Sequence, residues 1–182
     1  MTETLENRVQ AFLREEFRPD RQYSLRLEVE FNHHPIRGPI HAALYSFDVE
    51  GDHYYVFGGD TVPMIYPQMD LTIDELWPVQ LGTEYFLEQD VTEDTDRKSP
   101  IFLTYLKMVS TVFQEQLYIS KPDAIKIQKV YKLHDQKHIV GQAQFQDKTY
   151  SWIVGDITHF VYKKDLPPQI TWALHMGRIL LT

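Results

Sequence analysis

The feature that most constrains how this chain can fold is an internal repeat. The segment Trp77-Pro-Val-Gln-Leu-Gly-Thr-Glu-Tyr-Phe-Leu87 is similar to Trp172-Ala-Leu-His-Met-Gly-Arg-Ile-Leu-Leu181, which begins 95 positions later. Three further matches precede it in the same order: an apolar helical pattern at an offset of 100, a Pro-Asp pair at 103, and a strand ending in Gly-Asp at 96. One short match could arise by chance, but four in order indicate two copies of one module.

The hydrophobic periodicity gives both copies the same order of elements. The elements expected in the first copy are a helix over 3–17, strands over 23–31, 42–49 and 53–58, and a helix over 72–87. Those expected in the second are a helix over 101–119, strands over 125–133, 138–146 and 149–154, a short fourth strand over 158–162, and a helix over 167–181. We therefore predict an α+β fold of two tandem α-β-β-β-α modules, with antiparallel sheets and helices packed on one face.

The module boundaries follow from composition. Residues 88–98 are polar and contain five acidic side chains, so we place an acidic linker at 92–98 between modules spanning 1–91 and 99–182. Ser99 and Pro100 restart regular structure, because serine is a good helix cap and proline suits the first helical position. About 90 residues bury a limited core alone. We expect the copies to pack as one globular unit in a pseudo-two-fold arrangement, with the helix over 101–119 as their seam.

Local signals refine this outline. Glu50-Gly51-Asp52 is typical of a hairpin turn, and Thr72 with Glu75 forms a capping box. Prolines and glycines predict irregular structure over 33–40 and a turn-rich link over 63–70.

Three residues inside the Trp-to-Gly helices require a structural reason. Pro78 lies too deep for a first-turn proline, so that helix starts late or kinks there. Gly82 and Gly177 each cost about 1 kcal/mol relative to alanine. We expect close backbone approach at both glycines.

Composition excludes several classes of function. The net charge is −8, which disfavours a nucleic-acid partner and an anionic membrane surface, because both need clustered Lys and Arg. The chain contains no cysteine, so disulfides and cysteine-ligated metals are excluded. No signal peptide or membrane-spanning run is present, which favours a cytoplasmic location.

Three histidines suggest a metal site. His33, His34 and His41 lie within nine residues and could bind a divalent cation together with Asp60. Adjacent side chains on a strand point to opposite faces, however, and no recognised ligand spacing is present. We therefore favour a solvated loop and predict neither a metal nor a cofactor.

Asp60 and Asp156 each follow glycine at the end of a strand, in both copies. They could form a pair of carboxylates for acid/base chemistry or metal binding. Their recurrence favours a structural role in turns. No serine or other nucleophile has a catalytic setting, so we predict no catalytic residues and a non-enzymatic protein.

Dense aromatic residues on both hairpins favour a partner. Tyr54 and Tyr55 must point to opposite faces of their strand, and Trp152 lies on the matching hairpin of the second copy. Exposed tyrosine and tryptophan are favoured at protein interfaces, although the second copy or the 63–70 link could equally cover them.

The function expected from the sequence is binding of a protein or peptide, as an adaptor or chaperone does; the chain could also form a homodimer. The alternative is a small-ligand or metal-binding protein, or an enzyme, with a cleft between the modules. The contact candidates are His33, His34, His41, Tyr54, Tyr55, Asp60, Trp152 and Asp156.

Overall fold

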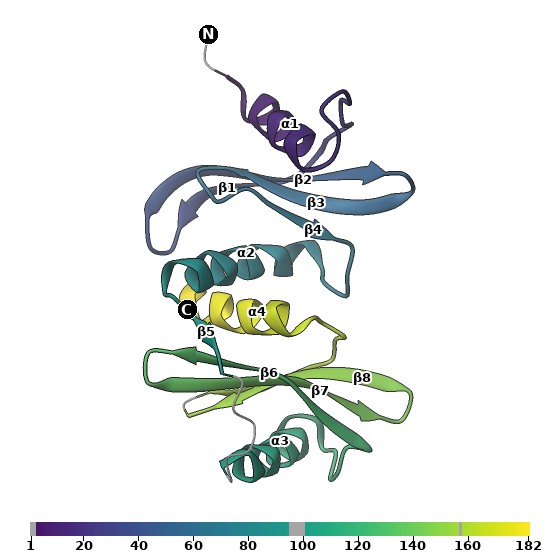
Figure 1. Cartoon of the computed structure of the whole chain (residues 1–182), viewed down its shortest axis with the longest axis vertical. Coiled ribbons are helices and arrows are strands. Elements are labelled where there is room, and N and C mark those ends of the chain that lie inside the picture. The colour runs from purple at the N-terminus through teal and green to yellow at the C-terminus, as the bar shows by residue number, and fades with distance from the viewer. Residues whose placement is uncertain (1–2, 95–100, 157) are drawn as a thin grey trace. The chain divides into compact units, whose positions relative to one another are not determined.

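A computed structural model describes residues 3–94, 101–156 and 158–182 of the chain. These residues form four helices and two antiparallel sheets, of four and five strands (Figure 1). The chain divides into two compact units, residues 1–69 and 70–182. The α+β class with antiparallel sheets is confirmed.

The first unit consists of one helix and the four-stranded sheet. Its elements are α1 (Leu5–Glu16), β1 (Arg26–His34), β2 (Gly38–Val49), β3 (Asp52–Gly59) and β4 (Met64–Pro67). The strands lie in chain order, and α1 covers one face of the sheet. The core between them is formed by Val9, Leu13, Tyr23, Ala43, Tyr45, Phe47 and Val56. The apolar face of the helix predicted for 3–17 therefore packs on the alternate side chains that β2 and β3 direct to one face of the sheet.

The hairpin between β2 and β3 forms as predicted. Val49 pairs with Asp52, so Glu50 and Gly51 are the two central turn residues. Both have positive φ, 52° and 89°, which a two-residue hairpin turn of this kind requires.

Two predictions for this unit are wrong. Residues 33–40 are largely regular, because β1 continues to His34 and β2 begins at Gly38. Pro39 pairs with His33 in β1 but lies beyond the last β2–β3 pair. Its missing N–H therefore removes no hydrogen bond between β2 and β3. The 63–70 link contains β4, an edge strand that ends at Pro67.

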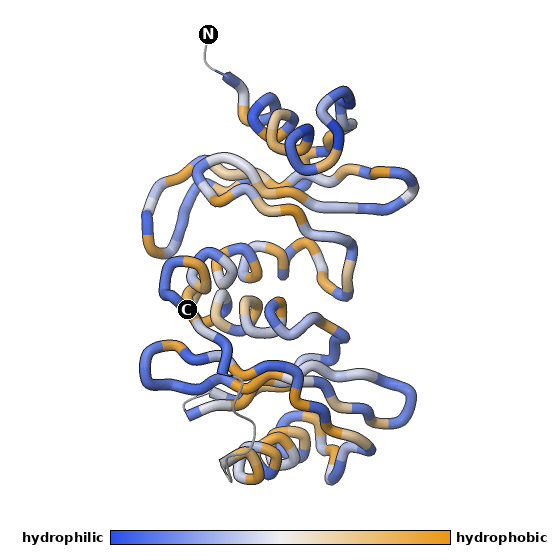
Figure 2. Tube along the Cα trace, in the orientation of Figure 1, coloured by the Kyte–Doolittle hydropathy of each residue, from blue (hydrophilic) through white to orange (hydrophobic). Residues whose placement is uncertain are grey.

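The second unit holds three helices and the five-stranded sheet. Its elements are α2 (Ile73–Glu88), β5 (Thr92–Glu93), α3 (Ile101–Leu117), β6 (Ala124–Leu133), β7 (Gln136–Phe145), β8 (Lys148–Gly155), β9 (His159–Tyr162) and α4 (Pro168–Leu181). Figure 1 shows α3 and α4 on opposite faces of this sheet, which corrects the expectation of helices on one face. Hydrophobic residues recur along α3 and the strands that it covers (Figure 2).

The number of strands per module also needs correction. β4 adds a strand to the three expected in the first copy, where none was predicted. In the second copy, β9 confirms the short fourth strand expected over 158–162. Part of the linker is structured as well, since Thr92 and Glu93 pair with Lys132 and Tyr131. Residues 95–98, and the predicted cap at Ser99 and Pro100, lie outside the described residues. The boundary between modules stays a prediction.

The two Trp-to-Gly helices, α2 and α4, pack directly against each other. A Cβ atom added at Gly82 would lie 1.9 Å from the backbone oxygen of Ala173, and one added at Gly177 would lie 1.7 Å from that of Pro78. Close backbone approach is therefore confirmed at both glycines. The expected seam at 101–119 is wrong, because α3 covers the sheet instead.

The capping box of Thr72 and Glu75 is present, and α2 begins directly after it. Pro78 consequently lies inside the helix, and the alternative of a late start is wrong. No helix within the described ranges is both long and apolar enough to cross a membrane.

Candidate functional site

The outer edge of β9 is the first part of the candidate site. β9 is the last strand of the second sheet, so no described strand pairs with that edge. A side chain forms hydrogen bonds to the backbone at this edge instead. The Val161 N–H donates to Oε1 of Gln116 at 3.1 Å, and Nε2 of Gln116 donates to the His159 carbonyl at 3.5 Å. A glutamine amide from α3 therefore occupies the place of a neighbouring strand.

A pocket lies on the α3 side of β9. It has a volume of about 310 Å³ and is lined by Thr104, Lys107, Met108, Thr111, Val112, Glu115 and His159. All but His159 come from α3. Met108 and Val112 supply apolar contacts, while Lys107 and Glu115 place charges of both signs at the pocket.

A second pocket lies on the α4 side of the same strand. Its volume is about 170 Å³, and it is lined by Phe160, Tyr162, His175, Arg178, Ile179 and Thr182. Phe160 and Ile179 are 37% and 47% exposed, and neighbouring Leu181 is 46% exposed. Successive side chains of a strand point to opposite faces, so His159 reaches the first pocket while Phe160 and Tyr162 reach the second.

A buried polar cluster forms the floor of the α4-side pocket. His175 is hydrogen-bonded to the hydroxyls of Thr158 and Tyr162, the latter at 3.0 Å from Nδ1. Burial lowers the pKa of His175 to about 4, and the nearby charges of His138, Arg178 and His159 act in the same direction. Burial also raises the pKa of Tyr162 to about 12, although Arg178 opposes this. Both groups are neutral near pH 7.

An ion-pair network joins this cluster to α2. Glu75 lies 2.8 Å from Lys164 and 3.2 Å from Arg178, and the Arg178 guanidinium stacks over the Tyr162 ring at 5.1 Å. Burial alone would raise the pKa of Glu75, but hydrogen bonds from Lys164 and Thr72 and the Lys164 charge outweigh it, so this pKa is lowered. The network fixes Arg178 at the wall of the pocket.

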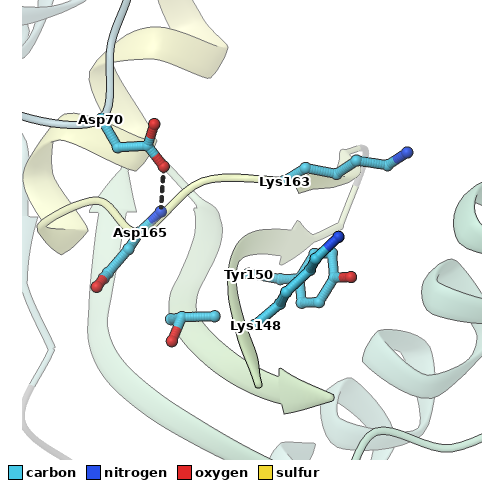
Figure 3. Close-up of a pocket in the computed structure, with 6 residues that line it drawn as sticks. Asp70, Lys148, Tyr150, Lys163 and Asp165 are labelled. Atoms are coloured by element: carbon cyan, nitrogen blue, oxygen red, sulfur yellow. Dashed lines mark hydrogen bonds between the residues drawn. The ribbon is translucent and has the colours of Figure 1, made fainter. Parts of the chain in front are cut away.

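A larger, more polar pocket lies where the chain leaves β9. It measures about 450 Å³ and is lined by Asp70, Lys148, Thr149, Tyr150, Lys163 and Asp165. Figure 3 shows the two aspartates on one side and both lysines with Tyr150 on the other. The Asp165 N–H donates to Asp70 at 3.1 Å, and the Gln142 amide donates to the Asp165 carboxylate, so both carboxylates are engaged in holding the loop.

The three histidines predicted as a group have separate surroundings. His34 is buried, and its Nδ1 accepts hydrogen bonds from the backbone N–H groups of Ile36 and Arg37. His41 is exposed, with Nε2 3.8 Å from Glu30, and His33 is exposed on β1. Among the described residues, no group of three His, Cys, Asp or Glu side chains could hold a metal ion.

Asp60 and Asp156 make equivalent contacts in different units. Oδ2 of Asp60 accepts from the His41 backbone N–H at 2.7 Å, and Oδ2 of Asp156 accepts from that of Lys137 at 3.4 Å. Asp156 also accepts from the Tyr105 hydroxyl at 2.9 Å. Each carboxylate therefore fixes the start of a neighbouring strand.

The aromatic candidates divide between the sheet faces, as alternation requires. Tyr54 packs against Phe17 and Phe47 under α1, whereas Tyr55 lies on the other face beside His53. Trp152 is fully buried in the core under α3, so it offers no surface to a partner in this structure.

Sequence reasoning missed the residues around β9. Phe160 carried an aromatic signal, but Gln116, His175 and Ile179 lie inside ordinary amphipathic helices. Only the packing of α3 and α4 on opposite faces brings them to one strand. Comparison with protein-family models, curated proteins and solved structures returns no match to this chain.

Proposed function

We propose that this chain is a non-enzymatic protein- or peptide-binding module, and that its binding site is the β9 edge. The observation that carries the proposal is one edge strand with an apolar pocket on each of its two faces. Extended peptides are recognised by such edges, because their side chains alternate and need a pocket on either side. The exposed Phe160, Ile179 and Leu181 add apolar surface at the same place.

The chemistry of the α4-side pocket supports binding over catalysis. The pKa of His175 lies near 4, so its ring remains neutral at pH 7, and both ring nitrogens are engaged by hydroxyl groups. Such a ring is a poor general base, because a base poised for catalysis has a pKa near the working pH. The polar cluster serves instead as a rigid floor beneath an apolar opening.

The proposal includes an internal duplication with a pseudo-two-fold arrangement. Three structural details recur at the sequence offsets. β1 and β6 each have a register irregularity, between Leu27 and Val29 in β1 and between Ile127 and Lys129 in β6, at an offset of 100.

The other two details involve glycine and aspartate. The contact of Asp60 with the His41 N–H recurs 96 positions later, as the contact of Asp156 with the Lys137 N–H. Gly82 contacts Ala173 and Gly177 contacts Pro78. Gly177 lies 95 positions after Gly82, and Ala173 lies 95 positions after Pro78. This reciprocity is expected of an isologous contact between equivalent helices.

The competing candidate is binding of a small ligand, and the observation that favours it is the pocket of Figure 3. Its volume of about 450 Å³ is within the usual range for ligand sites. Lys148 and Lys163 would attract an anionic group, with Asp70 and Asp165 opposite. A rise in melting temperature with inorganic phosphate or a dicarboxylate, abolished by Lys148→Gln with Lys163→Gln, would support this candidate.

The peptide-binding proposal can be tested with a phage-displayed library of random nine-residue peptides panned on the whole chain. The affinity of the best recovered peptide is then measured by fluorescence polarisation against three variants. Ile179→Asp places a charge in the α4-side pocket, and Thr104→Glu places one in the α3-side pocket. Leu103→Asp is the matched control, because Leu103 is 66% exposed and lines neither pocket.

We expect each pocket variant to weaken binding at least about tenfold, since burial of one large apolar side chain contributes about 1.5–3 kcal/mol. The control should bind as the parent chain does. Failure to recover any peptide, or equal affinity for all three variants, would reject this site.

A further inference from the structure

Gln116 forms hydrogen bonds to the backbone of β9 as a neighbouring strand would. His159 and Val161 are two residues apart, so their backbone groups point to the same edge. The Gln116 side chain supplies an acceptor to Val161 and a donor to His159, at 3.1 and 3.5 Å. An added strand offers the same two kinds of group.

The position of these groups on an edge strand explains why a side chain is placed there. An unpaired edge invites pairing with other chains, and proteins protect such edges with side chains or loops. The inner edge of β9 is already paired with β8, from Ser151–Tyr162 to Val154–His159. Among the described residues, only the side chain of Gln116 forms hydrogen bonds to the outer backbone of β9. This amide can rotate away, because two hydrogen bonds alone hold it there.

We propose that an extended segment of another polypeptide, with apolar side chains at alternate positions, adds to β9 as a sixth strand and displaces the Gln116 amide. This inference rests on the proposed function, since it specifies how the peptide is held. Side chains on one face of the added strand enter the pocket at Met108 and Val112. Those on the other face enter the pocket at Phe160 and Ile179.

The mode of binding predicts a pattern that side-chain contacts alone do not produce. In an added strand, the N–H groups of every second residue face β9 and the others face solvent. N-methylation removes one N–H at a time. Methylation at alternate positions of the recovered peptide should weaken binding tenfold or more, while methylation at the intervening positions should leave it nearly unchanged.

Displacement of Gln116 gives a second, independent readout. Gln116→Ala removes the amide that competes with the peptide, so affinity should rise about fivefold, the equivalent of one net hydrogen bond. Gln114→Ala is the matched control, because Gln114 is an exposed glutamine on the same helix. In the free Gln116→Ala protein, hydrogen exchange at the Val161 amide should become faster.

The outcomes separate the two proposals. An alternating methylation pattern with tighter binding to Gln116→Ala supports strand addition. Binding that depends on Ile179 and Thr104 but shows no alternation, or that weakens in Gln116→Ala, overturns strand addition and leaves the peptide-binding function standing. If Gln116→Ala only makes the chain dimerise in sedimentation velocity, without a change in peptide affinity, the occupant of the edge is a second copy and the inference is wrong. Loss of all peptide binding rejects both.

Discussion

Replacement of Gly177 by alanine tests the packing of α2 against α4. In an exposed helix this change would stabilise the protein by about 1 kcal/mol through helix propensity. Here the new Cβ would lie 1.7 Å from the backbone oxygen of Pro78, whereas real Cβ contacts stay beyond 3.0 Å. The helices must therefore separate by about 1.3 Å at this point.

The energetic cost follows from what has to move. The contact partner is backbone, which cannot rotate away as a side chain can. Overpacking of a core costs about 1–3 kcal/mol, and a backbone contact belongs at the upper end. After subtraction of the propensity gain, we expect a net loss of about 2 kcal/mol in the free energy of unfolding, or about 4–8 °C in melting temperature.

Urea unfolding followed by tryptophan fluorescence suits this measurement. The three tryptophans, Trp77, Trp152 and Trp172, all lie in the second unit, so the signal reports on the unit that contains both helices. Gln114→Ala provides an exposed helical control, which should change stability by less than about 0.5 kcal/mol. The reasoning is refuted if Gly177→Ala raises the stability. The double variant with Gly82→Ala should cost less than the sum of the single changes, because one separation of the helices relieves both clashes.

Two further predictions concern the polar cluster of the second unit. Because the folded-state pKa of His175 is about 4, below its ordinary value of 6.5, stability is fully present above pH 6.5 and is lost as the pH falls toward 4. Between pH 8 and pH 5 this amounts to about 2 kcal/mol, which His175→Gln should remove from the pH profile of urea unfolding; an unchanged profile would contradict the assignment. Glu75→Gln leaves Lys164 and Arg178 without their shared carboxylate and should cost about 2 kcal/mol, measured in the same assay. Asp74→Asn, at an exposed neighbouring position, should be nearly neutral, and equal effects of the two changes would count against the network.

The sequence alone determined most of the secondary structure. Periodicity of 3.6 or 2 residues located the four helices and seven of the nine strands that the described residues form. Both patterns are local, because each depends on one continuous stretch of chain. Turn chemistry fixed the β2–β3 hairpin, since Gly51 permits the positive φ that the turn needs. The glycines inside two helices correctly signalled close backbone contact, because nothing local would justify their cost.

Tertiary structure decided the rest. β4 and β5 are too short to show a period, and they exist only because a neighbouring strand pairs with them. Pro39 could enter a strand because its position in the ladder requires no N–H on the β3 side. The candidate site depends most on tertiary packing. Its residues Gln116, Phe160 and Ile179 lie far apart in the sequence and share no motif. They meet at β9 because α3 and α4 pack on opposite faces of one sheet, and packing between distant segments is not written in any local pattern.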